Sequence, residues 1–282
     1  MKAENGLIIA GLVFLFHRRL SASSAIGKFY DDDKIKPGSR VDQYWGTIKI
    51  KPAQLGVENN KGAQFSSVPE AIAHFDLYSI EFGNWLNQEQ RLGFMYASLV
   101  TLRDMAAVIG IRQDQMGMRK TLSLAFGARG RGGRAAAFYQ PHYQLINLTK
   151  THGPGTLCHE YGHAVDFYLG AHSGGRSIRK QPDYSGKRKD SSAWLMESIL
   201  DGVLWNDDGS PSTYQKWLDK ESDYYNRRTE IFARICEVFF LEGFKSKGIK
   251  NTWGVAGYSR DLPDKNLVKK VSGNLRKLFK KI

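Results

Sequence analysis

The stretch that most constrains this chain is Leu157–Asp166, because it contains the pattern His-Glu-x-x-His. On a helix, residues four positions apart lie one above the other. His159 and His163 can therefore direct ring nitrogens at one point about 2 Å from each. Glu160 then lies beside that point without being a ligand, where a general base can take a proton from a metal-activated water. The pattern predicts a metal site on a helix.

The flanking residues favour a helix from about residue 156 to 169. Pro154 and Gly155 interrupt the chain before it, and Gly170 can cap its end. An apolar stripe runs along the same stretch, formed by Leu157, Tyr161, Ala164, Val165 and Tyr168. The alternative is that the pattern arises by chance, with two histidines held by hydrogen bonds on a half-buried helix.

The composition is that of a globular protein. At 282 residues, with 41% hydrophobic and 12% aromatic residues, the chain can bury a sizeable core in one large or two small domains. Cys158 and Cys236 are the two cysteines, and they show no paired spacing typical of a disulfide framework or a cysteine-ligated zinc site. A reducing compartment is favoured.

The formal charge of +13 is concentrated near the carboxyl end. From Gly243 onward there are eleven lysines and arginines against two aspartates. A basic segment indicates nucleic acid, an anionic membrane surface or an acidic partner, or else a solvated helix face. From Asp264 to Ile282 the apolar residues recur at intervals of three and four, which predicts an amphipathic helix. Docking on the protein's own core is the commonest outcome for such a helix, with membrane and nucleic acid as alternatives.

Residues Leu7–Phe16 are almost wholly apolar and are followed by His17, Arg18 and Arg19. This run is shorter than the roughly 20 residues that a membrane-spanning helix needs, and its positive charge follows the apolar stretch. Three interpretations stay open. The segment is a short membrane anchor, a part buried against another protein or the core, or a signal peptide.

Patterns before the motif predict a small sheet. Strands are expected at Trp45–Ile50, Thr121–Phe126, Ala135–Tyr139 and Tyr143–Leu148, and a long helix at Asn87–Ile109, stopped by Gly110. Ala135–Tyr139 is the strand expected at the sheet edge beside the metal, where an extended peptide could pair with it.

The segment Arg129–Arg134 alternates glycine with arginine. It lacks the Lys-Ser/Thr ending of a phosphate-binding P-loop and is short for a disordered RNA-binding segment. A tight hairpin is predicted, with exposed arginines near the cleft that favour acidic substrate residues.

A catalytic zinc site of this kind needs a third protein ligand. Asp166 and Leu169 occupy the positions where another zinc peptidase class continues its motif with glycine and histidine, so a carboxylate from a later helix is expected. Glu197 is one candidate, with Asp201 four residues later. Glu230 is the other, on the same face of an apolar helix as Glu237, where a metal would be a partner for a buried carboxylate. Spacing alone leaves both open, and Arg234 competes as the partner of Glu230.

The His-Glu-Tyr-Gly-His motif at residues 159–163 and the later Thr-Glu-Ile-Phe-Ala-Arg at 229–234 resemble gluzincin-type metallopeptidase domains. Such domains occur in large polyvalent proteins of phages and conjugative elements and are distantly similar to the anthrax lethal factor catalytic domain. The resemblance runs from about Leu122 through Phe240.

The resemblance implies zinc held by His159, His163 and Glu230. It also implies an oxyanion-stabilising tyrosine shortly before the third ligand, and Tyr224 and Tyr225 both fit. Arg234 stands where lethal factor has an acid, which leaves the residues that support the ligands open.

We therefore expect an α+β, zincin-like fold with a small mixed sheet and an edge strand beside the motif helix. The expected divisions are an apolar segment and linker (1–25), a mainly helical region (26–115), the peptidase domain (116–245) and a basic tail (246–282). The expected function is zinc-dependent peptide hydrolysis by a phage or mobile-element protein, in a host cytoplasm or virion. Expected partners are a peptide substrate, a membrane through Leu7–Phe16 and an anionic partner through the tail. The alternative is a catalytically silent scaffold in a virion or on nucleic acid.

Overall fold

The structure is a computed structural model that describes residue 57 and residues 68–83, 88–127, 137–149, 153–172, 177–178 and 188–282. Its elements are α3 (Val68–Phe75), β1 (Ser79–Phe82), α4 (Gln88–Ile109), the 3-10 helix η2 (Gln113–Gly117), β2 (Ser123–Phe126), β3 (Ala137–Gln140), β4 (Leu145–Leu148), α5 (Leu157–His172), α6 (Ser192–Leu204), α7 (Thr213–Leu218), α8 (Arg228–Ser246) and α9 (Lys265–Phe279). The expectations for Leu7–Phe16, Trp45–Ile50 and Arg129–Arg134 lie outside the described residues.

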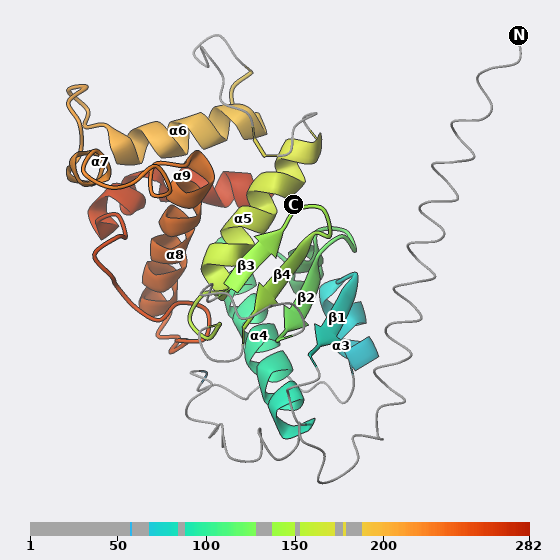
Figure 1. The fold of residues 1–282 in the computed structure, drawn as a ribbon. Helices are drawn as coiled ribbons and strands as arrows, with labels where there is room; N and C mark the ends of the chain where they lie inside the picture. The colour runs from blue at the N-terminus through green and yellow to red at the C-terminus, as the bar shows by residue number, and fades with distance from the viewer. Residues whose placement is uncertain are drawn as a thin grey trace, which may run out of the picture.

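The described strands form one small mixed sheet in the order β1-β2-β4-β3 (Figure 1). Strands β1, β2 and β4 are parallel, and β3 runs antiparallel to β4 at the edge. The two inner strands are buried along their whole length, whereas every residue of β3 is only partly buried. The predicted α+β class is confirmed, and the strand expected around residues 135–139 is this edge strand. The sequence analysis does not predict β1.

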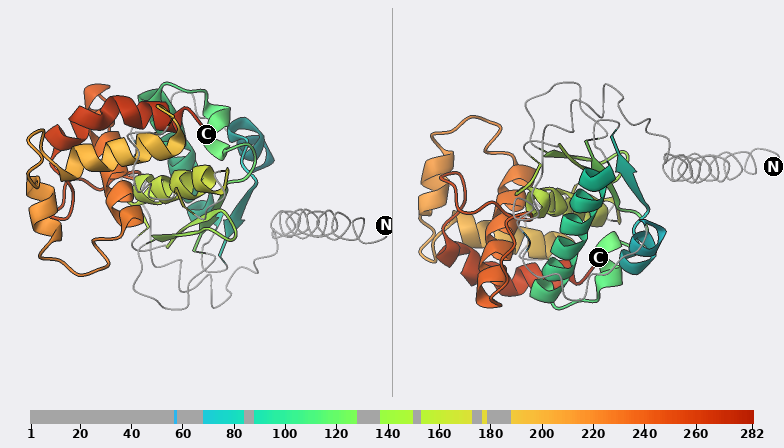
Figure 2. Two further views of the ribbon diagram at one scale, coloured as in Figure 1. Left: turned by 90° about the horizontal axis from the view of Figure 1, so that it is seen from above. Right: turned by 90° about the horizontal axis from the view of Figure 1, so that it is seen from below.

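Helices α4 and α5 lie on the same face of the sheet (Figure 2). Helix α4 contacts β2, and α5 contacts β3 and β4. The long helix predicted from Asn87 agrees with α4, which ends before Gly110 at a φ of 81°. Glycine adopts such a left-handed backbone conformation without steric cost, which explains the stop.

Helix α5 packs most extensively on α8, and a glycine allows the close approach. A Cβ atom added to Gly162 would lie 3.1 Å from the Cα of Ala233 and from the Sγ of Cys236, both on α8. The glycine between the two motif histidines thus brings the first half of α8 against the metal-site face of α5.

The predicted end of the motif helix at Gly170 is wrong, because α5 continues to His172. Gly170 lies inside the last turn, where an added Cβ would be 2.2 Å from the carbonyl carbon of Ser177. This glycine allows the following segment to cross close to the helix and does not cap it.

Helix α9 packs on α6 and α8, and its apolar face is buried. That face consists of Leu267, Val268, Val271, Leu275, Leu278 and Phe279. The amphipathic helix predicted from Asp264 is present, its first turn capped by the Asp264 side chain, and it docks on the core. None of the described helices combines the length and apolar character needed to cross a bilayer.

Candidate metal centre

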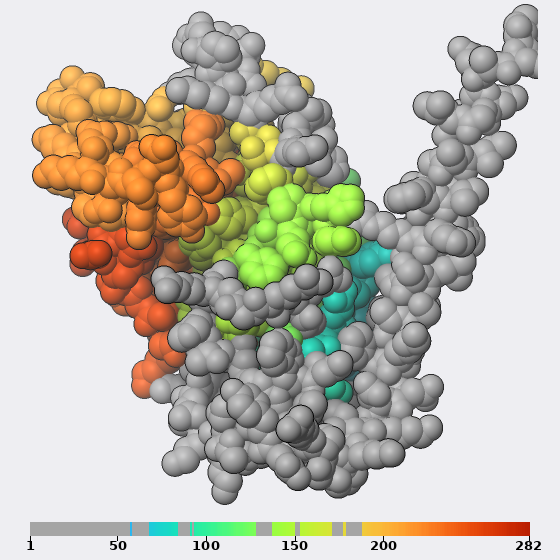
Figure 3. All heavy atoms as spheres, viewed as in Figure 1, coloured from blue at the N-terminus to red at the C-terminus, as the bar shows by residue number. Residues whose placement is uncertain are grey.

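Helix α5 places the two motif histidines one turn apart, with their rings edge to face at an interplanar angle of 76°. The Nε2 atoms of His159 and His163 are 3.1 Å apart, and the ring centroids are 4.8 Å apart. Both side chains are largely buried, with 16% and 12% of their surface exposed. On the face shown in Figure 3, α5 is visible between β3 and the orange segment that contains α7.

Glu230, in the first turn of α8, completes a group of three. Its Oε2 lies 3.5 Å from Nε2 of His159, and its Oε1 lies 3.5 Å from Nε2 of His163. The amino-terminal turn of a helix favours a carboxylate, because unpaired N–H groups give that end a partial positive charge. Among the described residues, these three form the one group of histidines, cysteines and acids whose donor atoms converge tightly enough for a metal ion.

The separations are short enough for one ion to bridge. The two Nε2 atoms are 3.1 Å apart, and each lies 3.5 Å from a different oxygen of Glu230. One donor atom from each of the three residues lies within 4.8 Å of the others. In addition, the buried Oε2 of Glu230 has no hydrogen-bond partner among the described residues. A buried acceptor without a partner is costly, and a cation at this point would satisfy it.

Glu197, the other candidate ligand, lies outside this group. Its two carboxylate oxygens accept hydrogen bonds from the Arg228 guanidinium, at 2.7 and 3.2 Å. The geometry therefore selects Glu230 from the two candidates. Asp166 is also committed to the fold, since its carboxylate accepts a hydrogen bond from the Ile178 backbone at 2.8 Å.

Glu237 contacts the nitrogen of His159 that points away from the centre of the group. Its Oε1 lies 2.5 Å from Nδ1 of His159, which leaves Nε2 facing the centre. Carboxylates that bind the far nitrogen of a metal-ligating histidine fix its tautomer and ring orientation. This role of Glu237 is not predicted from the sequence. The signal that could have indicated it is the spacing of seven residues from Glu230, which puts both carboxylates on one helix face.

Glu160 lies next to the group but is not one of its three members. Only 6% of the residue is exposed, and its Oε2 has no hydrogen-bond partner among the described residues. Burial raises the pKa of Glu160 to about 7, partly offset by the neighbouring His159 and by a hydrogen bond from the Tyr139 backbone on β3. The carboxyl group therefore reaches both the metal-site side and the edge strand.

The two candidate tyrosines have different surroundings. The Tyr224 side chain lies close enough to the Glu230 carboxylate to lower the pKa of Glu230, and 46% of the tyrosine is exposed. Burial of its hydroxyl and the adjacent Glu230 raise the pKa of Tyr224 to about 12. Tyr225 is partly buried, and its ring packs against Trp217 and under the Arg234 guanidinium. The structure thus brings the Tyr224 hydroxyl, and not that of Tyr225, next to the third ligand.

The charges within the group are strongly coupled. Burial lowers the pKa of His159, but the adjacent carboxylates of Glu230 and Glu237 outweigh burial and raise it to about 10. Burial and the charge on His159 lower the pKa of His163 to about 4. Burial opposes ionisation of Glu230, yet the two histidines lower its pKa to about 2. Without a metal, one proton on His159 therefore balances the Glu230 carboxylate.

The cysteines take no part in this group. Cys158 and Cys236 are buried and free, and burial raises the pKa of both thiols. Both remain protonated at neutral pH, in the form that is the poorer metal ligand.

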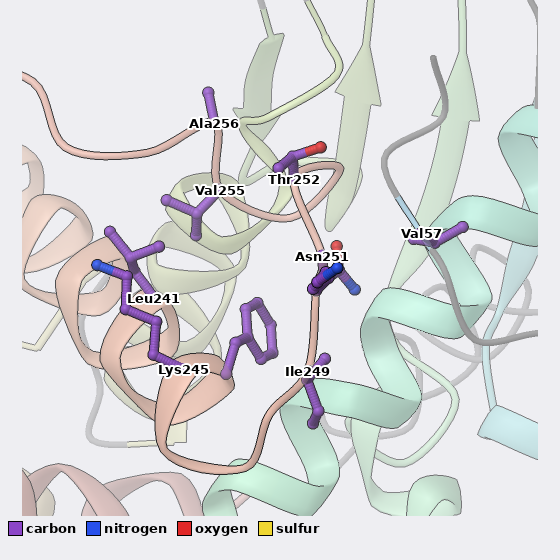
Figure 4. Close-up of a pocket in the computed structure, with 10 residues that line it drawn as sticks. Val57, Leu241, Lys245, Ile249, Asn251, Thr252, Val255 and Ala256 are labelled. Carbon is purple, nitrogen blue, oxygen red and sulfur yellow. The ribbon is translucent and has the colours of Figure 1, made fainter. Parts of the chain in front are cut away.

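A separate groove lies beyond the far end of α8 (Figure 4). It has a volume of about 440 Å³ and is lined by Val57, Leu241, Phe244, Lys245, Ile249, Lys250, Asn251, Thr252, Val255 and Ala256. None of the three ligand candidates lines this groove.

Comparison with protein-family models, curated proteins and solved structures finds no match. Any assignment of activity therefore depends on the geometry of the site itself.

Proposed function

We propose that this chain is a zinc-dependent peptidase with a zincin-like fold. The observation that carries the proposal is the convergence of donor atoms of His159, His163 and Glu230 to within 4.8 Å of one another, with Glu160 beside them and outside the ligand group. The small sheet with an antiparallel edge strand next to the motif helix agrees with the resemblance inferred from the sequence.

His159, His163 and Glu230 would hold the metal. Zinc, when bound, would act as a Lewis acid that polarises the substrate carbonyl and lowers the pKa of a water molecule to about 7. Glu160 accepts a proton from the attacking water as the water oxygen bonds to the carbonyl carbon. It then delivers that proton to the amine nitrogen as the carbon–nitrogen bond breaks. The buried position of Glu160 excludes bulk water from this transfer.

Two further groups of the chain position the substrate. The Tyr224 hydroxyl lies next to Glu230, and from there it would donate a hydrogen bond to the oxyanion that develops on the carbonyl oxygen. The edge strand β3 offers backbone groups for an extended peptide, and the Tyr139 backbone is close enough to hydrogen-bond Glu160. A peptide paired with β3 would therefore pass beside the general base.

The scaffold alternative does not account for Glu160. A chain that kept the metal only for structure gains nothing from a buried carboxylate outside the ligand group whose Oε2 accepts no hydrogen bond from the described residues. A phage or mobile-element origin and a virion or cytoplasmic location remain part of the proposal through the sequence resemblance alone.

Metal content tests the proposal. Wild-type protein purified without chelators should contain one zinc per chain by elemental analysis, and Glu230→Ala should lose it. Glu197→Ala is the matched control, because this carboxylate lies on a neighbouring helix, and it should keep the zinc. Metal-free wild-type protein that stays metal-free after incubation with zinc would overturn the proposal, and zinc loss in Glu197→Ala alone would reassign the ligand.

A further inference from the structure

Arg234 is a buried cation directly beside the third ligand. It lies one turn after Glu230 on α8, with 3% of its side chain exposed. Its Nη2 is 3.6 Å from Oε2 of Glu230. A buried charge is tolerated only where nearby groups compensate its loss of hydration, and the partners of the Arg234 guanidinium provide this compensation.

The guanidinium reaches three separate parts of the chain. Besides Glu230, its Nη1 donates a hydrogen bond to the carbonyl oxygen of Tyr225 at 3.3 Å. Its Nε lies 3.6 Å from Oδ2 of Asp261, in the loop that leads to α9. The planar fork of arginine can address three directions at once, whereas a lysine ammonium on a flexible stem cannot hold them in one plane.

The same group also contacts both tyrosine rings of the turn before α8. The guanidinium carbon lies 4.7 Å from the ring centroid of Tyr225 and 5.7 Å from that of Tyr224. Cation–π contacts of this kind are strongest where water is excluded, as it is at Arg234. The Tyr224 ring contacts two guanidinium groups, that of Arg227 at 5.5 Å and that of Arg234 at 5.7 Å, and Arg234 is the one that also contacts the ligand.

One oxygen of the ligand contacts both a histidine and the guanidinium. Oε2 of Glu230 lies 3.5 Å from Nε2 of His159 and 3.6 Å from Nη2 of Arg234. A shift of Arg234 would move both the ligand and the tyrosine turn.

We infer that Arg234 is a positioning residue that couples the orientation of the ligand Glu230 to the placement of the Tyr224 hydroxyl over the metal centre. This inference rests on the proposed function and adds to it. Glu237 supports His159, and Arg234 contacts both the ligand and the tyrosine ring.

The test compares Arg234→Lys with Arg228→Lys in the full chain. Arg228 lies two residues from Glu230 on the same helix but pairs with Glu197, which makes it a matched control. Each protein is loaded with Co²⁺ in place of zinc. The visible cobalt bands should shift in Arg234→Lys, because the carboxylate turns, and should stay unchanged in Arg228→Lys.

Kinetics with zinc and a cleaved peptide provide the second measurement. Arg234→Lys should lower kcat by about tenfold or more with KM within about twofold, since small misplacements of catalytic groups act on the reaction step. Removing the Tyr224 hydroxyl (Tyr224→Phe) should then cost far less in the Arg234→Lys background than in wild type, because coupled residues are not additive.

Three results would overturn the inference. A cobalt spectrum and kcat equal to wild type in Arg234→Lys would leave Arg234 as an anchor of the fold alone, and so would an undiminished effect of Tyr224→Phe. Wild-type protein that binds no Co²⁺ would defeat the proposed function and this inference with it. Should Arg234→Lys fail to fold, Asp261→Asn removes one partner of the guanidinium and should produce the same cobalt shift at smaller amplitude. An unchanged spectrum there counts against the coupling.

Discussion

Two helix pairs in this molecule are packed closely at a glycine, yet their interiors differ in chemistry. In the pair α6–α9, an added Cβ on Gly202 would lie 2.5 Å from Val271, and the facing residues are apolar apart from a hydrogen bond between Asn274 and Ser198. In the pair α5–α8, the close approach at Gly162 is surrounded by buried ionisable side chains. These are His159, Glu160, His163, Glu230, Arg234 and Glu237.

Apolar burial stabilises a helix pair by about 25 cal/mol per Å² removed from water, whereas a buried charge without a close partner destabilises it. The apolar contacts of the α6–α9 interface therefore serve to stabilise the folded chain. The α5–α8 interface is not explained in this way, because it buries an oxygen of Glu160 and one of Glu230 that accept no hydrogen bond from the described residues. The difference agrees with the proposal that α5–α8 holds the metal centre, and each prediction below tests one side of this contrast.

The largest expected effect is on catalysis. Glu160→Gln keeps the shape of the side chain but cannot accept the proton, so kcat/KM for a cleaved peptide should fall by about a thousandfold. Zinc content should be unchanged, because Glu160 is not one of the three converging donors. Activity within threefold of wild type would remove the general-base role, and joint loss of zinc and activity would make Glu160 a ligand.

The next effect belongs to the apolar pair. Leu275 on α9 is fully buried, so Leu275→Ala should lower the free energy of unfolding in urea by about 3 kcal/mol. The folded fraction should still bind one zinc per chain. A folded variant with reduced zinc affinity would break the contrast, since the α6–α9 pair would then support the site as well.

A smaller effect, on zinc affinity, is expected from the carboxylate that contacts Nδ1 of His159. Glu237→Gln keeps a hydrogen bond to Nδ1 of His159 but removes the charge, and zinc affinity measured by chelator competition should fall by about tenfold. Glu242→Gln, one turn and a half further along α8 and bonded to Tyr258, serves as the control and should bind zinc like wild type. Equal affinity in both variants would show that Glu237 does not support the metal.

The smallest effect is expected on the exposed side of α9. Lys277 forms an ion pair with Asp190 at 3.0 Å, with about half of each side chain exposed. Solvent screens such a pair, so Lys277→Ala should change the free energy of unfolding by less than about 0.5 kcal/mol. A larger loss would mean that the basic face contributes to the fold.

Sequence alone predicted the local features well. The motif helix, the long helix α4 and the strands around residues 123–126, 137–140 and 145–148 each follow from periodicity within a single segment. The site histidines and Glu160 belong to one helical turn and its neighbour, so spacing within the helix was enough to group them.

Features that depend on distant segments were not determined by spacing. Which carboxylate is the third ligand depends on how α8 packs against α5. This packing brings Glu230 and Glu237 to His159, whereas Glu197 pairs with Arg228 and lies outside the group. Strand β1 is four residues long and joins the sheet through parallel pairing with β2, for which a short segment carries no local signal. The preference for Tyr224 over Tyr225 likewise follows from the turn that Arg234 holds.

The two buried thiols have a practical consequence for following motion in the site. Cys158 lies on α5 and Cys236 on α8, and both are fully shielded from solvent at the contact between these helices. An alkylating reagent can reach them only when the helices separate, so its rate of reaction measures how often the interface opens. Because the chain has two cysteines and no others, the signal has no competing source. Slower alkylation in the presence of zinc would report directly that the metal ties α5 to α8.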